Sequence, residues 1–436
     1  MNRRLHICLL SAGRVFANVY GGEEMFTISL GNWLAKDGHD VSLMGIDYAG
    51  LKSKFLHDSY RNRQSGDDSS ITIKNNNENN KNDRTNNDGG NENNKKLIKR
   101  DKINRFNLRH LLYSLRLVIW VFQVIKIVSI NVKKPVTLIH AQDAGYTGLA
   151  AVVSGRILRI PVIISLHSFR YRLIELEPSI PRIFRKALLK LERSLDVFAI
   201  KNANNIMVVN SSLEEYCKQI TDKKIYFFTP AIKSKNFEFS ENKRDNIRKE
   251  LGLDRKSKVI GYVGRLTPEK NLLNFLVSFA KLVSEDPSLI KLVIAGIGPM
   301  ERELKKFITQ NNIKDKVIFC GARNDIGSIL SSLDIFVLPS YTEGLSTALL
   351  EAMTCGRAIV CSDIPGNREL LTHNKEGLLV NPNDSESLKS NIQLLCNDST
   401  LRLKLGNNAK MKASQYTEDI VFESLLKHYQ QFVCQQ

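Results

Sequence analysis

Apolar runs rich in β-branched residues alternate with amphipathic stretches along this chain, and the alternation occurs in two separate series. The first series contains the runs Leu5 to Leu10, Val41 to Ile46, Val136 to His140, Pro161 to His167 and Asn205 to Asn210. The second contains Val259 to Val263, Leu289 to Ala295, Val317 to Phe319, Ile335 to Leu338 and Ala358 to Cys361. Strands that alternate with helices at this spacing predict doubly wound parallel sheets. Because 436 residues are too many for one hydrophobic core, we expect two Rossmann-like α/β domains.

The domain boundaries follow from where the alternation stops and restarts. We expect a first domain over 1–228, a linker over 229–244 that carries Pro230 and several charges, and a second domain over 245–415. Residues 416–436 are expected to form a helix that crosses back to the first domain. Ligands of open α/β sheets bind outside the carboxyl ends of the strands, so two such domains predict a central cleft.

The composition changes abruptly inside the first domain. Of the 21 residues from Lys74 to Asn94, eleven are Asn and none is hydrophobic. Such a segment buries too little apolar surface to offset its ordering entropy. We therefore predict a disordered surface insertion over about 65–97, rather than a functional prion-like tract.

The chain is basic, with 63 Lys and Arg against 45 Asp and Glu and a net charge of +18, which favours an anionic partner. Much of the excess lies in the segment 95–134, where eleven basic residues accompany Asp101 alone. Trp120 and Phe122 are interleaved with them. A basic amphipathic helix with aromatic residues suits an anionic membrane surface; the alternative is an ordinary domain helix with a solvated basic face. In either case we expect Ile127 to Val132 to pack in the core.

Other patterns exclude several classes of protein. The stretch nearest to a membrane span, Leu117 to Ile125, has nine uncharged residues, whereas a spanning helix needs roughly 20. Seven scattered cysteines without a C-x2-C pair argue against a zinc module or disulfide scaffold and for a reducing, cytoplasmic compartment. Because no helix-turn-helix, RNP, zinc-finger or OB signature occurs, we do not expect nucleic acid as a partner.

Two loops of the second series carry candidate phosphate-binding residues. Arg265 and Lys270 stand five residues apart in a loop that opens a helix, so they can neutralise a diphosphate together with helix N-terminal amides. A solvated charged loop is the alternative. The second loop, Gly296-Ile297-Gly298-Pro299, lacks the spacing of a dinucleotide fingerprint, and a tight turn is its alternative interpretation.

Two carboxylates mark a third segment, Pro339 to Met353. Glu343 lies in the loop after a predicted strand, and Glu351 lies eight residues further on, about 2.2 turns of helix. Both can therefore face one ligand at different depths. Gly344 leaves the start of the helix open to a phosphate, and the apolar residues around Glu351 argue against a plain solvent-exposed helix.

These motifs together resemble the retaining GT-B glycosyltransferases of group 1, the family 4 type, that carry a Glu-x7-Glu motif. Their order along the chain also agrees, with Gly-Arg-x4-Lys first, then Gly-x-Gly-Pro, then Glu343 to Glu351, and finally Gly377-Leu378-Leu379-Val380. In the first half, the residues that resemble the family are Gly21-Gly22, Gly38-His39-Asp40-Val41, Ile139-His140 and Leu166-His167. The resemblance covers nearly everything except the Asn-rich insertion and the basic segment.

The resemblance implies a role for each matching residue. Arg265 and Lys270 would hold the nucleotide diphosphate and stabilise it as leaving group, so no metal or other cofactor would be needed. Glu351 would bind the ribose hydroxyls, and Glu343 would fix the donor sugar with amides near Leu345 and Ser346. The implied site also includes Gly22, whose backbone would approach the ligand closely, Gly298 and Gly344, and His167 against a hydroxyl of the transferred sugar. A buried structural histidine is the alternative for His167 and the preferred interpretation of His140.

The implied activity is transfer of a sugar, with retained anomeric configuration, from a nucleotide-diphosphate sugar to an acceptor hydroxyl. We expect a saccharide or lipid-linked acceptor in the synthesis of cell-envelope polysaccharide, glycolipid or lipid-linked oligosaccharide, with the enzyme on the inner face of the plasma membrane. The alternatives are a sugar-phosphate or soluble-sugar synthase and a non-catalytic scaffold. One departure is the acidic pair Glu23-Glu24 after the first glycine pair, which argues against a direct phosphate contact from that loop.

Overall fold

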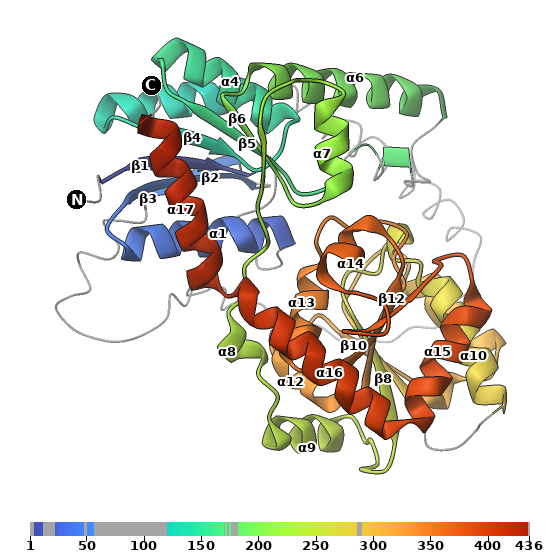
Figure 1. Cartoon of the computed structure of the whole chain (residues 1–436). Coiled ribbons are helices and arrows are strands. Elements are labelled where there is room, and N and C mark those ends of the chain that lie inside the picture. Colours follow the sequence, from blue (N-terminus) through green and yellow to red (C-terminus); the bar gives the residue numbers. More distant parts are fainter. Residues whose placement is uncertain are drawn as a thin grey trace, which may run out of the picture.

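The computed structural model describes residues 4–11, 22–47, 50–55, 120–169, 171, 174–175, 182–285 and 290–434. The Asn-rich stretch predicted to be disordered, and residues 95–119 of the basic segment, lie outside these ranges. Within them the chain forms two α/β domains, each built around its own sheet and its own hydrophobic core (Figure 1).

The first sheet has seven strands in the order β3-β2-β1-β4-β5-β6-β7. They are β1 (His6–Leu10), β2 (Asp40–Asp47), β3 (Gly50–Phe55), β4 (Leu138–Ala141), β5 (Val162–Leu166), β6 (Asn205–Val208) and β7 (Ile225–Phe227). Six run parallel; five of these were predicted from the sequence, and the short strand β7 was not. The edge strand β3, which the sequence did not predict, pairs antiparallel with β2; its segment lacks the apolar run that identified the other strands.

The second sheet has six strands, all parallel, in the order β10-β9-β8-β11-β12-β13. They are β8 (Lys258–Val263), β9 (Ile290–Ala295), β10 (Val317–Gly321), β11 (Ile335–Leu338), β12 (Ala358–Ser362) and β13 (Leu378–Val380). The central strands are buried from end to end because helices cover both faces of the sheet. This explains their continuous apolar runs.

Helices connect the parallel strands in each domain. In the first domain they are α1 (Gly22–Lys36), the helical residues 120–133, α4 (Tyr146–Leu158), α6 (Arg182–Asn202) and α7 (Ser211–Lys218). In the second they are α10 (Leu272–Glu285), α11 (Glu301–Gln310), α12 (Ile326–Ser332), α13 (Thr347–Thr354), α14 (Pro365–Leu370), α15 (Ser385–Asn397) and α16 (Ser399–Ala413). Right-handed crossovers place α4 and α6 on one face of the first sheet and α1 on the other, as Figure 1 shows.

The stretch 229–244, which we expected to be a linker, contains α8 (Ser234–Phe237) and the start of α9 (Glu241–Glu250). Helix α9 is anchored to the second domain through two guanidinium groups. Arg244 and Arg248 lie 2.7 and 2.9 Å from the two carboxylate oxygens of Asp334, just before β11. The charges of this stretch suggested a solvated segment, whereas their partner is a carboxylate about 90 residues away.

The C-terminal helix α17 (Glu418–Cys434) leaves the second domain and lies against α1 of the first (Figure 1). Its buried face, which includes Phe422, Tyr429 and Phe432, belongs to the first hydrophobic core. Where α17 begins, a β-bridge joins Ile232 to Thr417. The two connections between the domains therefore run side by side.

Candidate functional site

Loops that leave the carboxyl ends of the two sheets meet at Gly344. A Cβ atom at this position would lie 1.7 Å from the backbone oxygen of His167, so only glycine permits the approach. The Asn210 side chain donates a hydrogen bond to the Gly344 carbonyl, 3.2 Å away, and the Ser211 amide donates one to Glu369 Oε1 at 3.0 Å. Leu345 packs against both hydrophobic cores. The structure therefore brings His167 and the Glu343 to Ser346 loop together.

Lys270 and Glu343 form an ion pair at this edge of the second sheet. Lys270, at the end of η1 (Pro268–Lys270), places Nζ 2.6 Å from Glu343 Oε1. Ser340 Oγ donates to the same oxygen, also at 2.6 Å. The two charged side chains are 14% and 9% exposed, so the pair is largely withdrawn from water. The carboxylate of Glu343 therefore compensates the charge of Lys270.

Arg265 lies in the same loop but in a different environment. Its side chain is 63% exposed, and Nη2 is 3.4 Å from Glu269 Oε1. Glu269 is also bound by Thr267 Oγ1 at 2.6 Å, and Tyr262 donates its hydroxyl to the Arg265 carbonyl at 2.8 Å. The backbone of the loop is therefore held while the guanidinium remains accessible to an anion.

Glu351 lies on α13 among apolar residues. Burial raises the pKa of Glu351 to about 8, and within the described ranges its carboxyl has neither a cation nor a hydrogen-bond donor. The N-terminus of α13 is capped by Ser346, whose Oγ accepts from the Leu349 amide at 3.3 Å. The Ser346 hydroxyl is thus used by the helix cap, and the Glu351 carboxyl remains unpaired.

His167 follows β5, and its ring lies between two aromatic side chains. The ring centroids of Phe26 and Phe228 are 5.5 and 5.0 Å away, both in edge-on geometry. Burial lowers the pKa of His167 to about 3, so the ring is neutral near pH 7. Its Nε2 atom is 2.8 Å from Gln142 Oε1.

His140 is the structural histidine that the sequence predicted it to be. It is fully buried in β4, with Nδ1 2.6 Å from the Tyr429 hydroxyl and Nε2 2.6 Å from Ser165 Oγ. Burial lowers the pKa of His140 to about 3. Both ring nitrogens are therefore engaged within the first domain.

The two remaining glycines of the predicted site have different surroundings. A Cβ at Gly298 would lie 2.3 Å from the carbonyl oxygen of Leu266, so this glycine permits the loops after β8 and β9 to pack together. Gly22 begins α1, with Glu23 and Glu24 in the first helical turn, where a carboxylate is stabilised by the helix dipole. Ser11, after β1, donates a hydrogen bond to Glu23 at 3.1 Å, which gives the unexpected acidic pair a local structural role.

Sequence reasoning missed two polar residues at this site. Asn210 caps α7 and reaches across to Gly344, and Gln142 holds His167. Gln142 follows β4 directly and Asn210 lies two residues after β6, at the edge where ligands of parallel sheets bind. The ends of the predicted strands Val136 to His140 and Asn205 to Asn210 were the available signal. Among the described residues no three His, Cys, Asp or Glu side chains cluster in a way that would hold a metal ion.

The two facing α/β domains have the GT-B fold. Residues 243–412 match the family "Glycosyl transferases group 1", so the second domain belongs to that family. The fold of the whole chain is shared with sucrose-phosphate synthase from Thermosynechococcus elongatus, with a TM-score of 0.71, 18% identity, and coverage of 99% of this chain and 100% of the other. HepE of Anabaena, solved in complex with UDP, gives a TM-score of 0.67 at 18% identity and covers 97% and 99%.

A curated relative is similar in sequence as well. It is the UDP-Gal:alpha-D-GlcNAc-diphosphoundecaprenol alpha-1,3-galactosyltransferase of Escherichia coli. It is 28% identical over 315 residues, which cover 70% of this chain and 78% of the relative. The chain therefore has a homologue whose acceptor is lipid-linked.

The raised pKa of Glu351 predicts how stability depends on pH. The unfolded chain releases this proton near the ordinary carboxyl pKa, whereas the folded protein holds it up to about pH 8. The free energy of unfolding should therefore fall as pH rises between these two values. We expect Glu351→Gln to raise Tm relative to the parent by roughly 2–4 °C at pH 8.5, the change that about 1 kcal/mol produces, and to have a smaller effect at pH 5.

Differential scanning calorimetry at both pH values checks this expectation. Glu386→Gln, at an exposed carboxylate on α15, is the matched control and should show no such pH-dependent gain. A Glu351→Gln variant that is less stable than the parent at pH 8.5 would show that the carboxylate is satisfied in the ligand-free protein.

Proposed function

We propose that this glycosyltransferase transfers a sugar from a UDP-sugar to a lipid-linked saccharide with retention of anomeric configuration. The observation that carries the proposal is the Lys270–Glu343 ion pair, which is largely withdrawn from water. Arg265 is accessible in the same loop as Lys270, and Glu351 on α13 has no partner. The relative that uses UDP-Gal and the neighbour that binds UDP support a uridine nucleotide.

The donor diphosphate would replace Glu343 as the partner of Lys270. Its oxygens compete with Glu343 for Lys270, while Arg265 approaches from the solvent side. Glu343, released from the lysine, is then available to a hydroxyl of the donor sugar, and the ribose hydroxyls donate to the partly buried Glu351. The two cations thus stabilise the diphosphate as it leaves.

Retention would follow because the acceptor hydroxyl attacks the anomeric carbon on the same face from which the diphosphate leaves. The acceptor oxygen bonds to the anomeric carbon as the bond to the diphosphate breaks, and a phosphate oxygen takes the acceptor's proton. His167 is neutral, so it is suited to a hydrogen bond with a sugar hydroxyl rather than to proton transfer.

The donor site is tested by two single substitutions. We expect Lys270→Ala and Glu351→Ala each to lower kcat/KM for UDP-sugar turnover at least tenfold, equivalent to about 1.4 kcal/mol of transition-state stabilisation. UDP-galactose and UDP-glucose are the donors to assay. Lys281→Ala removes an exposed lysine of α10 that pairs with Glu386 and should leave kcat/KM unchanged. Full activity in both site variants would place the donor site elsewhere.

We further propose that transfer needs no divalent metal, because Arg265 and Lys270 supply the positive charge that the leaving diphosphate requires. Turnover should be the same, within error, in EDTA and in added Mg²⁺ or Mn²⁺. Loss of activity in EDTA with recovery on adding Mn²⁺ would contradict this, and ³¹P NMR of UDP release would measure it directly.

The acceptor side of the proposal places the first domain on an anionic membrane. Residues 120–133 bury Gln123, Ile127 and Ile130 and expose Phe122 at 55% and Val132 at 81%. We had expected Val132 to be in the core with Ile127; instead it lies on the outer face of the helix. Phe122, Ile125 and Val132 share that face because they are three and seven residues apart.

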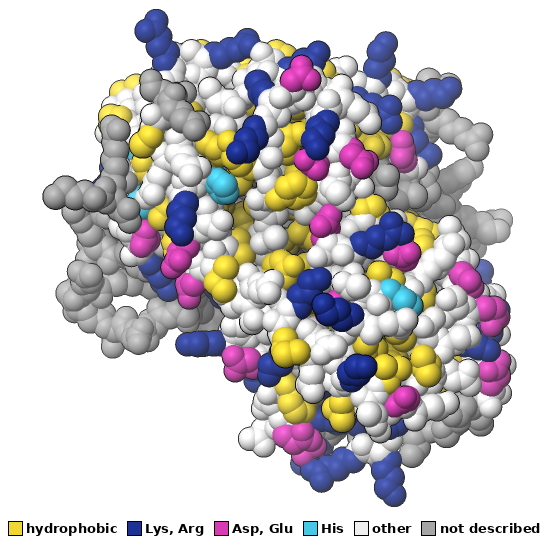
Figure 2. Space-filling view, viewed as in Figure 1, with side chains coloured by type: hydrophobic (Ala, Val, Ile, Leu, Met, Phe, Trp, Pro, Cys, Tyr) yellow, Lys and Arg dark blue, Asp and Glu magenta, His cyan; other side chains and the backbone are white. Residues whose placement is uncertain are grey.

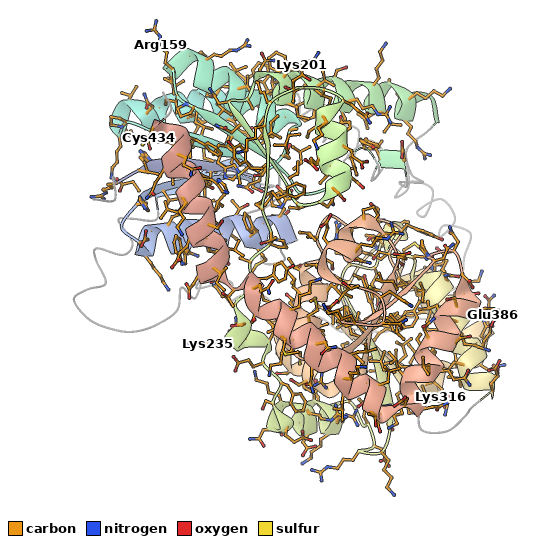
Figure 3. The ribbon with its side chains drawn as sticks, in the orientation of Figure 1. Arg159, Lys201, Lys235, Lys316, Glu386 and Cys434 are labelled. Atoms are coloured by element: carbon orange, nitrogen blue, oxygen red, sulfur yellow. The ribbon has the colours of Figure 1, made fainter. Side chains whose placement is uncertain are left out.

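Further cations lie on the same side of the first domain. A groove of about 700 Å³ follows α6 and is lined by Leu189, Val197 and Phe198 together with Lys186, Lys190, Arg193 and Lys201. Lys and Arg side chains follow this outer edge in Figure 2, and Figure 3 places Arg159 and Lys201 along it. Apolar surface mixed with cations suits the headgroup region of an anionic bilayer. No helix in the described part of the chain is long and apolar enough to span a membrane.

Vesicle co-sedimentation tests the membrane-facing surface. The parent should bind phosphatidylcholine vesicles that contain phosphatidylglycerol, because each basic residue near such a surface contributes about 1 kcal/mol. Binding should fall as salt shortens the screening length below roughly 8 Å. A Phe122→Ser, Ile125→Ser, Lys126→Glu variant should lose most of this binding.

The matched control changes equivalent exposed residues of α16 in the second domain, Leu403→Ser, Lys404→Glu and Met411→Ser, and should bind like the parent. Equal loss in both variants, or no parental binding at low salt, would favour a soluble acceptor and an enzyme of the soluble-sugar synthase type.

A further inference from the structure

A line of buried polar side chains connects the C-terminal helix to His167. It begins at Tyr429 on α17, passes through His140 on β4 to Gln142, and ends at the ring of His167. Tyr429, His140 and Gln142 are fully buried. The line joins residues 289 positions apart in sequence, and it ends at the boundary between the two domains.

The hydrogen bond between Gln142 and His167 determines which ring nitrogen carries the proton. An amide oxygen can only accept, so with Gln142 Oε1 at 2.8 Å the His167 Nε2 atom must be the donor. The ring is neutral because burial lowers its pKa, so Nδ1 is then unprotonated. No partner for Nδ1 occurs within the described ranges, and it keeps a lone pair for an incoming hydroxyl.

The rest of the line holds the Gln142 amide in this orientation. Its nitrogen lies 3.3 and 3.4 Å from the two ring nitrogens of His140, so the amide N–H group lies over the face of that ring. The His140 ring is itself held on one side by Tyr429 and on the other by Ser165, both at 2.6 Å. Rotating the amide by 180° would place its oxygen against the imidazole and its nitrogen at His167. The neighbouring rings Phe26 and Phe228 restrict movement of the His167 ring itself.

We propose that Gln142 is a positioning residue for sugar transfer, and that Tyr429 of the C-terminal helix is its distant support. Gln142 holds His167 in the Nε2-protonated tautomer, with Nδ1 available to accept a hydrogen bond from a hydroxyl of the donor sugar. The effect on catalysis rests on the proposed function. The tautomer of His167 does not, because it is a property of the protein without substrate.

A double-mutant cycle separates this role from simple packing. Gln142→Met keeps the side-chain length but removes the acceptor, and we expect it to lower kcat/KM for the UDP-sugar about tenfold. In a His167→Ala background the same change should have almost no further effect, because residues that act through one another are not additive. Additive losses would mean that Gln142 acts independently of His167 and would overturn the proposal.

Gln123→Met is the matched control for loss of a buried glutamine. Gln123 is also fully buried in the first domain, but it lies on the helix at 120–133, and within the described ranges its amide has no hydrogen-bond partner. This variant should keep kcat/KM within twofold of the parent.

Tyr429→Phe should lower kcat/KM several-fold. Tyr226→Phe is its control, because the Tyr226 ring contacts Phe432 of the same helix, and it should leave kcat/KM unchanged.

The tautomer is measured directly, without any turnover, by long-range ¹H–¹⁵N NMR on protein labelled at histidine. In the parent, His167 should be protonated at Nε2 alone between pH 6 and 8.5, and Gln142→Met should populate the Nδ1-protonated form. If Gln142→Met does not fold, Gln142→Glu serves instead, because a carboxylate at this position should raise the His167 pKa and make the ring titrate. An unchanged His167 signal in the folded variant would overturn the proposal, whereas an inactive parent with the expected tautomer would count against the proposed function only.

Discussion

The parallel arrangement of the strands is the constraint on which the rest of this structure depends. Because the strands of each sheet, apart from β3, point the same way, the loops that follow them emerge at one edge of each domain. His167 and Asn210 come from the first edge, and Lys270, Glu343 and Gly344 come from the second. The two edges touch where Gly344 lies against the His167 backbone, and a side chain larger than hydrogen at that position would separate them.

The site places its two carboxylates in opposite electrostatic states. Glu343 is paired with Lys270 and accepts a hydroxyl hydrogen bond, whereas Glu351 is desolvated and unpaired, with its pKa raised to about 8. The first arrangement holds a lysine where a phosphate could replace its carboxylate partner, and the second leaves a partly buried carboxyl group without a partner. Groups held in unfavourable surroundings at a site reduce the stability of the folded protein in exchange for function.

The sequence predicted both domains, and it predicted the residues that are close together along the chain. Arg265, Lys270, Glu343 and Glu351 were recognisable because loop and helix spacing are local properties of a sequence. The pairing of Lys270 with Glu343 was not predictable, because it joins residues 73 positions apart and depends on how adjacent loops fold. Strand β3 lacked an apolar run, and the charges of α9 resembled those of a linker because their partner, Asp334, is remote.

The position of α17 has a consequence for biosynthesis. Its residues Phe422, Tyr429 and Phe432 complete the core of the domain that is translated first. When that domain leaves the ribosome it therefore lacks one of its core helices, and the apolar surface that packs against α17 stays uncovered until that helix emerges. An incompletely packed domain exposes hydrophobic surface, so the core of the first domain is complete only after α17 has been synthesised.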